Sequence, residues 1–445
     1  MNQKRVVVID AVGLSPRHFE SKEKVPYLNS LITNGHLHRM NPVFPALTLP
    51  AQASLTTGVY PDAHGVVSNG FYFPENYQIA FWEQASSLVQ SERIWDRLKK
   101  RDPGHKTAVL FFQNSLYASC DVVITPKPIH TEESLILWCY SKPIGLYEKI
   151  TEKQGEFPLF SYWGPLASID GSRWIAQSSL EVMSREKPDL MYVYLPHLDY
   201  SSQKYDPSDA RIDEDLKCLD DEVKRIVEGI KDMGLSEETV FVILSEYILS
   251  GVQGDIPINR LLREKGLLRV REIKGREYLD CELSPAFAMV DHQIAHIYIK
   301  PGSEKAVRTV LEGVNGIDLI LDRKGKKKYR VDNARSGDIL AVSARNKWFS
   351  YYWWEDRAKE PDFATHIDIH RKPGYDPLEL FFDPGTFNIS QDTSLIHGSH
   401  GYPPLTGDDQ VVFLVCGERA DDFKVPENLC ITDVSKCIED YLSSK

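Results

Sequence analysis

Short, uninterrupted apolar runs separated by helical patterns most constrain the fold of this chain. Five such runs occur, at residues 6–9, 107–112, 190–195, 240–244 and 411–415. Uninterrupted runs rich in Val and Ile are typical of strands buried on both faces of a parallel sheet. Apolar residues spaced by three or four positions from Ile212 to Ile230 predict an amphipathic helix, and Gly234 follows as a stop. The alternation predicts an α/β fold with a doubly wound, mostly parallel sheet.

The segment from 250 to 394 has a different character. It contains an alternating stretch at 286–299 and few signatures of buried parallel strands. We therefore expect a smaller inserted α+β cap at 250–394, within a core made of 1–249 and 395–445. Its aromatic cluster would either form ordinary core or stack on a base or apolar leaving group. The cluster consists of Phe349, Tyr351, Tyr352, Trp353 and Trp354.

Composition argues against several function classes. The net charge is −12 and the basic clusters are short, so we expect no nucleic acid polymer as partner. If the substrate is an anion, bound divalent cations rather than net charge would attract it. We find no apolar span of the length that a bilayer requires. The seven cysteines are scattered and never form a C-x-x-C pair, which predicts reduced thiols in a cytoplasmic protein.

Polar side chains follow four of the five apolar runs, where ligands of a doubly wound sheet gather. They are Asp10, Gln113, Asp199 and Glu246. Any one of them is equally explained by a strand that exits into a polar loop. Three carboxylates that converge on one edge are harder to explain in that way, and they indicate a ligand site.

Thr48 stands just before a predicted helix. Pro50 suits the first helical turn, residues 51–57 can be helical, and Gly58 is a good terminator. Thr48 is therefore either a helix cap or the neighbour of an anion bound at the helix N-terminus. Its hydroxyl becomes a nucleophile toward phosphorus if a divalent cation lowers its pKa. Two cations roughly 4 Å apart would also clamp the attacking and leaving oxygens.

The segment 44–65 carries the order F-P-x-L-T-x-P, then S-L-x-T-G-x-Y-P-x-x-H-G. It resembles the nucleophile motif of the nucleotide pyrophosphatase/phosphodiesterase family within the alkaline-phosphatase superfamily. Residues 67–72 continue the match, and Asp10, Asp199 and His400 follow in the family's order. The resemblance is closest to a divergent, bacterial-type branch, and the cap matches only loosely.

The resemblance implies an alkaline-phosphatase-like core, Thr48 as the nucleophile and two divalent metal ions, with zinc expected first. By that resemblance, Asp10 and Thr48 would hold one cation, while Asp199 and His400 would hold the other. Asn69 would contact a non-bridging oxygen of the substrate, as part of a substitute for an oxyanion hole.

Three positions depart from the family's pattern. Gln203 stands where the family has a metal-binding His, and Glu246-Tyr247 replaces an Asp-His pair. Ala51 replaces a phosphate-contacting Asn, although the neighbouring Gln52 offers an amide that would contact the substrate in its place. Glu246 still ligates as a carboxylate, whereas an amide and a phenol are poorer zinc ligands.

Two explanations of these departures stay open. In the first, the site has drifted toward oxygen ligation that favours Mn²⁺ or Mg²⁺, or has lost one metal. In the second, residues of the cap complete it. The best candidates are Asp368 and His370, which on one face of a strand would lie about 7 Å apart. The same residues are also consistent with a polar strand that leads into a turn.

His292 and His296 have the i, i+4 spacing of a helical zinc pair. Their surroundings are strand-like, and in a strand the two imidazoles would stand about 13 Å apart. They could not share one metal ion. Either His292 alone reaches the site, or both histidines are structural.

The expected function is a metal-dependent phosphohydrolase that cleaves phosphodiester or pyrophosphate bonds of a small, nucleotide-like substrate through a phospho-threonine intermediate. One alternative is a phosphomonoester or phosphonate hydrolase on the same core. Another is a catalytically impaired protein that binds a phosphorylated ligand. Sulfate is the weaker option, because the sulfatases of this superfamily use a modified Cys or Ser and position 48 is neither.

Overall fold

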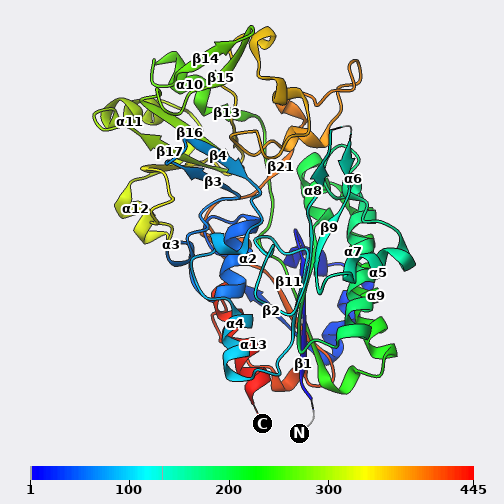
Figure 1. Ribbon diagram of the computed structural model, residues 1–445. Helices are drawn as coiled ribbons and strands as arrows, with labels where there is room; N and C mark the ends of the chain where they lie inside the picture. The colour runs from blue at the N-terminus through cyan, green and yellow to red at the C-terminus, as the bar shows by residue number, and fades with distance from the viewer. Residues whose placement is uncertain (1–2, 133, 445) are drawn as a thin grey trace.

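The computed structural model describes residues 3–132 and 134–444. Its centre is an eight-stranded mixed sheet with the order β2-β22-β11-β1-β10-β5-β6-β9 (Figure 1). The five central strands are parallel: β11 (Thr239–Leu244), β1 (Arg5–Ala11), β10 (Leu190–Leu195), β5 (Thr107–Leu110) and β6 (Val122–Pro126). Three strands run antiparallel to their neighbours: β2 (Gly35–Met40), β22 (Val411–Cys416) and β9 (Cys139–Lys142).

Each of the five apolar runs is a strand of this sheet, so the predicted α/β core is confirmed. The run at 411–415 departs from the parallel expectation, because β22 pairs antiparallel with both β11 and β2. All of its residues are buried. An uninterrupted apolar run reports burial on both faces, and the direction of the strand depends on how the chain returns to the sheet.

Helices cover both faces of the sheet, as a doubly wound fold requires (Figure 1). One layer contains α2 (Thr48–Thr57), α4 (Ile94–Arg101) and α13 (Val434–Ser443). The other contains α5 (Leu146–Gln154), α7 (Ile169–Glu186) and α9 (Asp213–Asp232). The predicted amphipathic helix is α9, and Gly234 lies beyond its end with a φ of 74°. The shorter helices of these layers are α1 (Pro26–Leu31), α3 (Pro61–His64), α6 (Leu159–Tyr162) and α8 (His197–Lys204).

The segment predicted as a cap has its own four-stranded antiparallel sheet, so its α+β character is confirmed. The strand order is β16 (Ala286–Asp291), β17 (Ile294–Ile299), β19 (Ile339–Ser343) and β18 (Ile317–Leu321). Its helices are α10 (Ile258–Glu264), α11 (Glu304–Glu312) and α12 (Arg323–Lys328). Two-stranded pairs flank it: β12 (Ser250–Gly251) with β21 (Gly398–Ser399), β13 (Asp255–Pro257) with β20 (Trp348–Ser350), and β14 (Val270–Ile273) with β15 (Arg276–Leu279).

A second hydrophobic core includes buried side chains of this sheet and of the segments packed against it. The five aromatic side chains of the cap cluster are buried in it, which confirms their interpretation as core. Ile79 and Phe81 also belong to this core. They come from β4 (Gln78–Phe81), which pairs with β3 (Gly70–Phe73) and precedes the predicted start of the cap. The boundaries at 249/250 and 394/395 stay a prediction.

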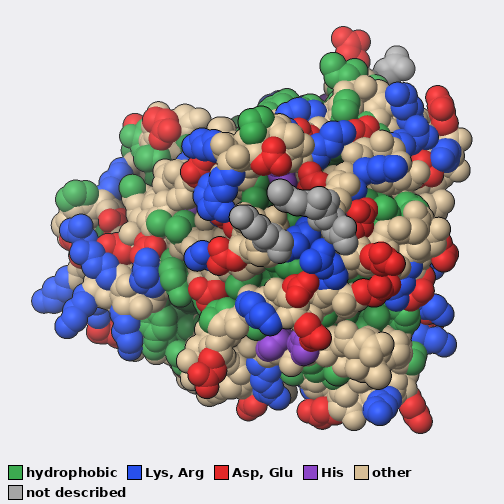
Figure 2. Space-filling model, turned by 90° about the horizontal axis from the view of Figure 1, so that it is seen from below, with side chains coloured by type: hydrophobic (Ala, Val, Ile, Leu, Met, Phe, Trp, Pro, Cys, Tyr) green, Lys and Arg blue, Asp and Glu red, His purple; other side chains and the backbone are tan. Residues whose placement is uncertain are grey.

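Other sequence expectations concern the whole molecule. Within the described residues, no helix is both long and apolar enough to cross a bilayer. The seven cysteines, all in the described part, are free thiols. Figure 2 shows the face around the chain termini, where acidic and basic side chains are interspersed. The cytoplasmic location stays a prediction.

Candidate active site

Three carboxylates meet at the carboxyl-end edge of the central sheet. Asp10 belongs to β1 and pairs in register with Leu244, the last residue of β11. Glu246 follows two positions later in the chain. On the other side of β1, β10 ends at Leu195, and α8 then carries Asp199. Parallel strands therefore bring together carboxylates that lie far apart in the sequence, as the sequence predicts.

Burial leaves these carboxylates short of partners. Asp10 and Glu246 are fully buried, and Asp199 is 6% exposed. Asp10 Oδ1, both oxygens of Glu246 and Asp199 Oδ1 lack a hydrogen-bond partner. Burial raises the pKa of Asp10 to about 7 and that of Asp199 to about 7. Burial and the nearby Asp10 raise the pKa of Glu246 well above its usual value. Such a cluster must bind protons or a cation to be stable.

Thr48 is the first residue of α2 and is buried beside this edge. The helix runs through the predicted 51–57 segment, and Gly58 follows it in the left-handed conformation with a φ of 79°. The Thr48 hydroxyl lies 3.0 Å from the Tyr247 hydroxyl. Burial is the main cause that raises the pKa of Tyr247 far above its usual value, so this phenol stays protonated at neutral pH. The contact holds the threonine hydroxyl in one orientation.

The amide of Asn69 fastens the start of α2 to the cap. Its Oδ1 accepts a hydrogen bond from the Leu49 N–H at 3.0 Å. Its backbone N–H donates to Asp291 at 2.7 Å, and its side-chain amide donates to the same carboxylate at 3.2 Å. These contacts are internal to the protein, and the expected contact with substrate stays a prediction.

Gln52 lies one helical turn beyond Thr48 and contacts Asp10. Its amide donates weakly to Asp10 Oδ2 at 3.5 Å, and its Oε1 accepts from the Gln113 N–H at 2.6 Å. Gln52 thus joins the end of β1 to the loop after β5. A role in contacting substrate oxygens, as expected from the sequence, is again a prediction.

Four aromatic rings form a column next to the carboxylates. Tyr247 stacks on His400 with centroids 3.8 Å apart and planes 9° apart. His400 lies 3.8 Å from His292, and His292 stacks on Tyr375 at 3.8 Å. His292 and Tyr375 come from the cap segment, so the column joins the two parts of the molecule.

His292 is the functional candidate that sequence reasoning left undecided. It occupies the turn between β16 and β17 with a φ of 57°, and its Nδ1 lies 2.8 Å from Asp291 Oδ1. The ring thus lies against His400, as the first of the two alternatives requires, and a role for His292 as a ligand stays a prediction. His296 is structural: its Nε2 lies 3.1 Å from the Val67 carbonyl. The break in the alternating pattern at residues 291–293 is the signal that could have placed His292 in a turn.

Asp199 accepts a hydrogen bond from Gln203, one of the residues that depart from the family's pattern. The Gln203 amide donates to Asp199 Oδ2 at 2.7 Å, and Gln203 Oε1 accepts from the Tyr375 hydroxyl at 2.9 Å. His400 Nε2 lies 3.8 Å from Asp199 Oδ1, and His400 Nδ1 lies 2.8 Å from the Ala46 carbonyl. The structure therefore brings Asp199 and His400 together, as the resemblance implies, and their role as ligands stays a prediction.

The predicted strand carrying Asp368 and His370 is wrong. Residues 369–371 form a turn. Asp368, just before it, accepts from the Arg371 N–H and pairs with the Arg371 guanidinium at 2.8 Å. His370 is exposed, and its Nδ1 lies 3.1 Å from the Phe81 carbonyl. Neither side chain has a recorded contact with Asp10, Thr48 or Asp199 in the described structure. Their assignment as metal ligands gains no support from these positions.

The parts of the site differ in how well their side chains could hold a metal ion. Across residues 3–132 and 134–444, no group of three or more His, Cys, Asp or Glu side chains is arranged to hold a metal. Asp10 and Glu246 nevertheless have buried oxygens without partners, and the Thr48 hydroxyl contacts Tyr247, the residue that follows Glu246. Oxygen donors of this kind suit hard cations such as Mg²⁺ and Mn²⁺. These residues fit an oxygen-liganded cation.

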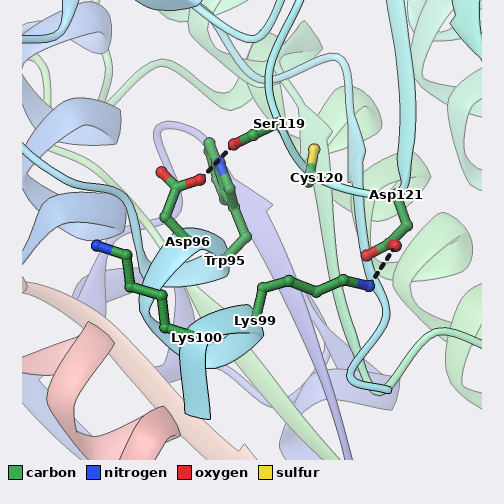
Figure 3. Close-up of a pocket in the computed structure, with 7 residues that line it drawn as sticks. All are labelled: Trp95, Asp96, Lys99, Lys100, Ser119, Cys120 and Asp121. Carbon is green, nitrogen blue, oxygen red and sulfur yellow. Dashed lines mark hydrogen bonds and ion pairs between the residues drawn. The ribbon is translucent and has the colours of Figure 1, made fainter. Parts of the chain in front are cut away.

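A separate cavity of about 240 Å³ lies beside α4, toward the end of the molecule that holds the termini (Figures 1 and 3). Lys99 pairs with Asp121 at 2.8 Å, and Ser119 bonds Asp96. Lys100 pairs with Glu92 at 2.6 Å. Both lysines that line the cavity are therefore paired with carboxylates of the protein.

Solved structures share this fold. Murine ectonucleotide pyrophosphatase/phosphodiesterase 5, as an inactive threonine-to-alanine variant in complex with AMP, superposes with a TM-score of 0.62 at 14% identity. That match covers 99% of this chain and 96% of the other. Phosphonoacetate hydrolase from Sinorhizobium meliloti, in complex with phosphonoformate, has a TM-score of 0.63 at 16% identity with the same coverage. Similarity at this level establishes the fold alone.

Sequence relatives point to the same group of proteins. The chain is 25% identical over 228 residues to ectonucleotide pyrophosphatase/phosphodiesterase family member 3 of Bos taurus, which is 50% of this chain and 22% of the relative. It is 21% identical to an uncharacterized pyrophosphatase/phosphodiesterase of Schizosaccharomyces pombe, over 55% of this chain and 44% of the relative. The matches thus span less than half the length of these relatives. The family model described as type I phosphodiesterase/nucleotide pyrophosphatase matches residues 6–402, and the chain belongs to that family.

Proposed function

We propose that this protein hydrolyses phosphodiester or pyrophosphate bonds in a small phosphorylated substrate, with Thr48 as the nucleophile and a divalent cation at Asp10 and Glu246. One observation carries the proposal: a buried threonine hydroxyl at a helix N-terminus lies beside carboxylates whose oxygens have no partner. Family membership supports the reaction class. The inactive threonine-to-alanine variant of the murine neighbour, bound to AMP, supports a threonine in this role.

The chemistry divides into two displacements at phosphorus. Thr48 Oγ1 attacks, an oxygen–phosphorus bond forms, and the bond to the leaving group breaks, which leaves a phospho-threonine. Water then attacks the same phosphorus and releases the Thr48 hydroxyl. A bound cation supplies a lower pKa for the hydroxyl and neutralises charge in the transition state. Tyr247 orients Oγ1, and Gln52 holds Asp10 in place.

Several finer assignments belong to this proposal. The substrate is expected to be nucleotide-like, and a diester is favoured over a monoester or a phosphonate. The assignment of two zinc ions, with Asp199 and His400 holding the second, stays a prediction from the resemblance. Both the AMP complex and the phosphonoformate complex of the structural neighbours are compatible with a small phosphorylated ligand.

The test measures hydrolysis of bis-p-nitrophenyl phosphate and p-nitrophenyl phosphate. Metal-stripped protein is refilled in turn with Mn²⁺, Mg²⁺ and Zn²⁺, beside Thr48→Ala and the matched control Thr48→Ser. We expect metal-dependent turnover that falls at least about 1,000-fold in Thr48→Ala and less in Thr48→Ser, which keeps a hydroxyl. The ratio of diester to monoester rates identifies the class. Absence of turnover with every metal, while AMP still binds, would favour the phospho-ligand-binding alternative.

A further inference from the structure

We propose that this site binds one divalent cation, at the oxygens of Asp10, Glu246 and Thr48, and that the protein's own side chains fill the place of a second. The inference deepens the proposed function, because it concerns the same site. It contradicts the two-cation expectation that the resemblance implies. The basis is a contrast between two groups of donors on one sheet edge.

The first group has oxygens available for a cation. Asp10 and Glu246 are fully buried, and three of their four carboxylate oxygens have no hydrogen-bond partner. No Lys or Arg in the described structure forms an ion pair with either of them. An unpaired buried carboxylate strongly destabilises a fold unless it binds a proton or a cation. Carboxylate and hydroxyl oxygens are hard donors, so Mn²⁺ or Mg²⁺ fits this group better than Zn²⁺.

In the second group, which contains Gln203, Tyr247, Asp199 and His400, most polar atoms already form hydrogen bonds within the protein. Gln203 uses both ends of its amide, one on Asp199 Oδ2 and the other on the Tyr375 hydroxyl. The Tyr247 hydroxyl is taken by Thr48 at 3.0 Å. These are two of the positions where the sequence departs from the family's pattern. An amide and a phenol that are hydrogen-bonded to other protein groups do not act as zinc ligands.

The ring column occupies the space beside this second group. The flat stack of Tyr247 on His400, with planes 9° apart, places a phenol ring against one face of the imidazole. His292 lies 3.8 Å from the ring of His400, and Tyr375 stacks on His292. Asp199 Oδ1 and His400 Nε2 remain, 3.8 Å apart, and His292 Nε2 is also buried without a partner. Zinc sites in proteins use three or four protein ligands, and within the described residues these three side chains are not arranged as a group that could hold a metal ion.

The experiment counts metal ions instead of turnover. Purified full-length chain is stripped with a chelator, dialysed against Mn²⁺ and analysed by elemental mass spectrometry together with Mn²⁺ titration followed by electron paramagnetic resonance. We expect about one Mn²⁺ per chain. Asp10→Asn should weaken binding at least 10-fold. The matched control Asp199→Asn makes the same chemical change at the other group and should retain about one Mn²⁺. Two ions or none in the unmodified chain would overturn the inference, as would loss of the ion in Asp199→Asn.

A double variant tests whether Gln203 and Tyr247 prevent a second cation from binding. Gln203→His combined with Tyr247→His removes the amide and phenol and adds two imidazoles. We expect a folded double variant to take up a second ion when dialysed against Zn²⁺, with circular dichroism confirming the fold. A folded variant that still binds one ion argues against the inference. One Mn²⁺ without turnover contradicts only the proposed function, whereas two ions with turnover contradict only the inference.

Discussion

The two halves of the site lie at the same edge of the sheet but differ in how far their polar groups are hydrogen-bonded within the protein. The carboxylate half, Asp10 and Glu246, is supplied by core strands alone and keeps buried oxygens without partners. The ring half combines Tyr247 and His400 from the core with residues of the cap. There, hydrogen bonds and stacked rings engage Tyr247, Gln203 and Tyr375, while Asp199 Oδ1 and His292 Nε2 have no hydrogen-bond partner.

The difference teaches where a ligand is needed. Buried polar groups in folded proteins are almost always hydrogen-bonded, and exceptions call for a bound ion or a functional role. The carboxylate half is such an exception. The ring half makes most of its contacts within the protein: it contacts Thr48 through Tyr247 and connects core to cap. The following predictions test whether this contrast holds.

The largest effect is expected from Asp10→Asn. Turnover should fall at least about 100-fold, because the amide is a poor substitute for the carboxylate as a cation ligand. Chelator-treated Asp10→Asn should also be more stable than the unmodified chain at pH 8, by roughly 2 kcal/mol or more, since the buried charge is gone. Urea denaturation and bis-p-nitrophenyl phosphate hydrolysis measure the two effects. A less stable metal-free variant would show that contacts within the protein, such as that with Gln52, already stabilise the Asp10 carboxylate.

A change of pH is expected to have an intermediate effect on the free energy of unfolding of the metal-free protein. The folded-state pKa of Asp10 is raised from its ordinary 3.8 to about 7, so the metal-free fold binds a proton that the unfolded chain releases. The free energy of unfolding should therefore fall as pH rises from about 4 to about 7. Asp199 is shifted in the same direction and to about 7, so it adds to this loss.

Mn²⁺ should reverse that loss, because it replaces the proton on the carboxylates. At a concentration of 100 times its Kd, the melting temperature should rise by about 3 °C at pH 8 and by less at pH 5.5, where protons compete. Thermal unfolding with and without chelator at both pH values measures this. An equal rise at the two pH values would mean that the ion binds elsewhere. Asp10→Asn, which lacks the carboxylate, serves as the control.

The smallest effect is expected within the ring half. Tyr375→Phe keeps the stacked ring and removes the hydroxyl that donates to Gln203 Oε1 at 2.9 Å. The free energy of unfolding should fall by about 1 kcal/mol, with Mn²⁺ stoichiometry unchanged. Tyr352→Phe is the matched control, because the Tyr352 hydroxyl is buried without a partner, and it should cost less. A change in Mn²⁺ stoichiometry in Tyr375→Phe would mean that the two halves are not separate.

Sequence patterns predicted much of the core and part of the site. The apolar runs located five strands of the central sheet, and Pro50 and Gly58 bracketed a helix that begins at Thr48. The polar residues after the runs located Asp10 and Glu246. The error at Asp368 and His370 has a local cause: side-chain and backbone contacts of Asp368 favour a turn over the extended chain that the alternation of polar residues suggested.

What the sequence by itself determined is the class of fold, the edge where the carboxylates meet and the place of Thr48. These follow from short-range patterns, since apolar runs, helix ends and the residues just after strands are local features. Tertiary structure alone decided the antiparallel direction of β22, the arrival of His292 and the bonds of Gln203. Gln203 and Tyr375 are 172 positions apart, and no local pattern specifies a contact across that distance. Packing of the cap on the core determined which side chains of the ring half contact one another.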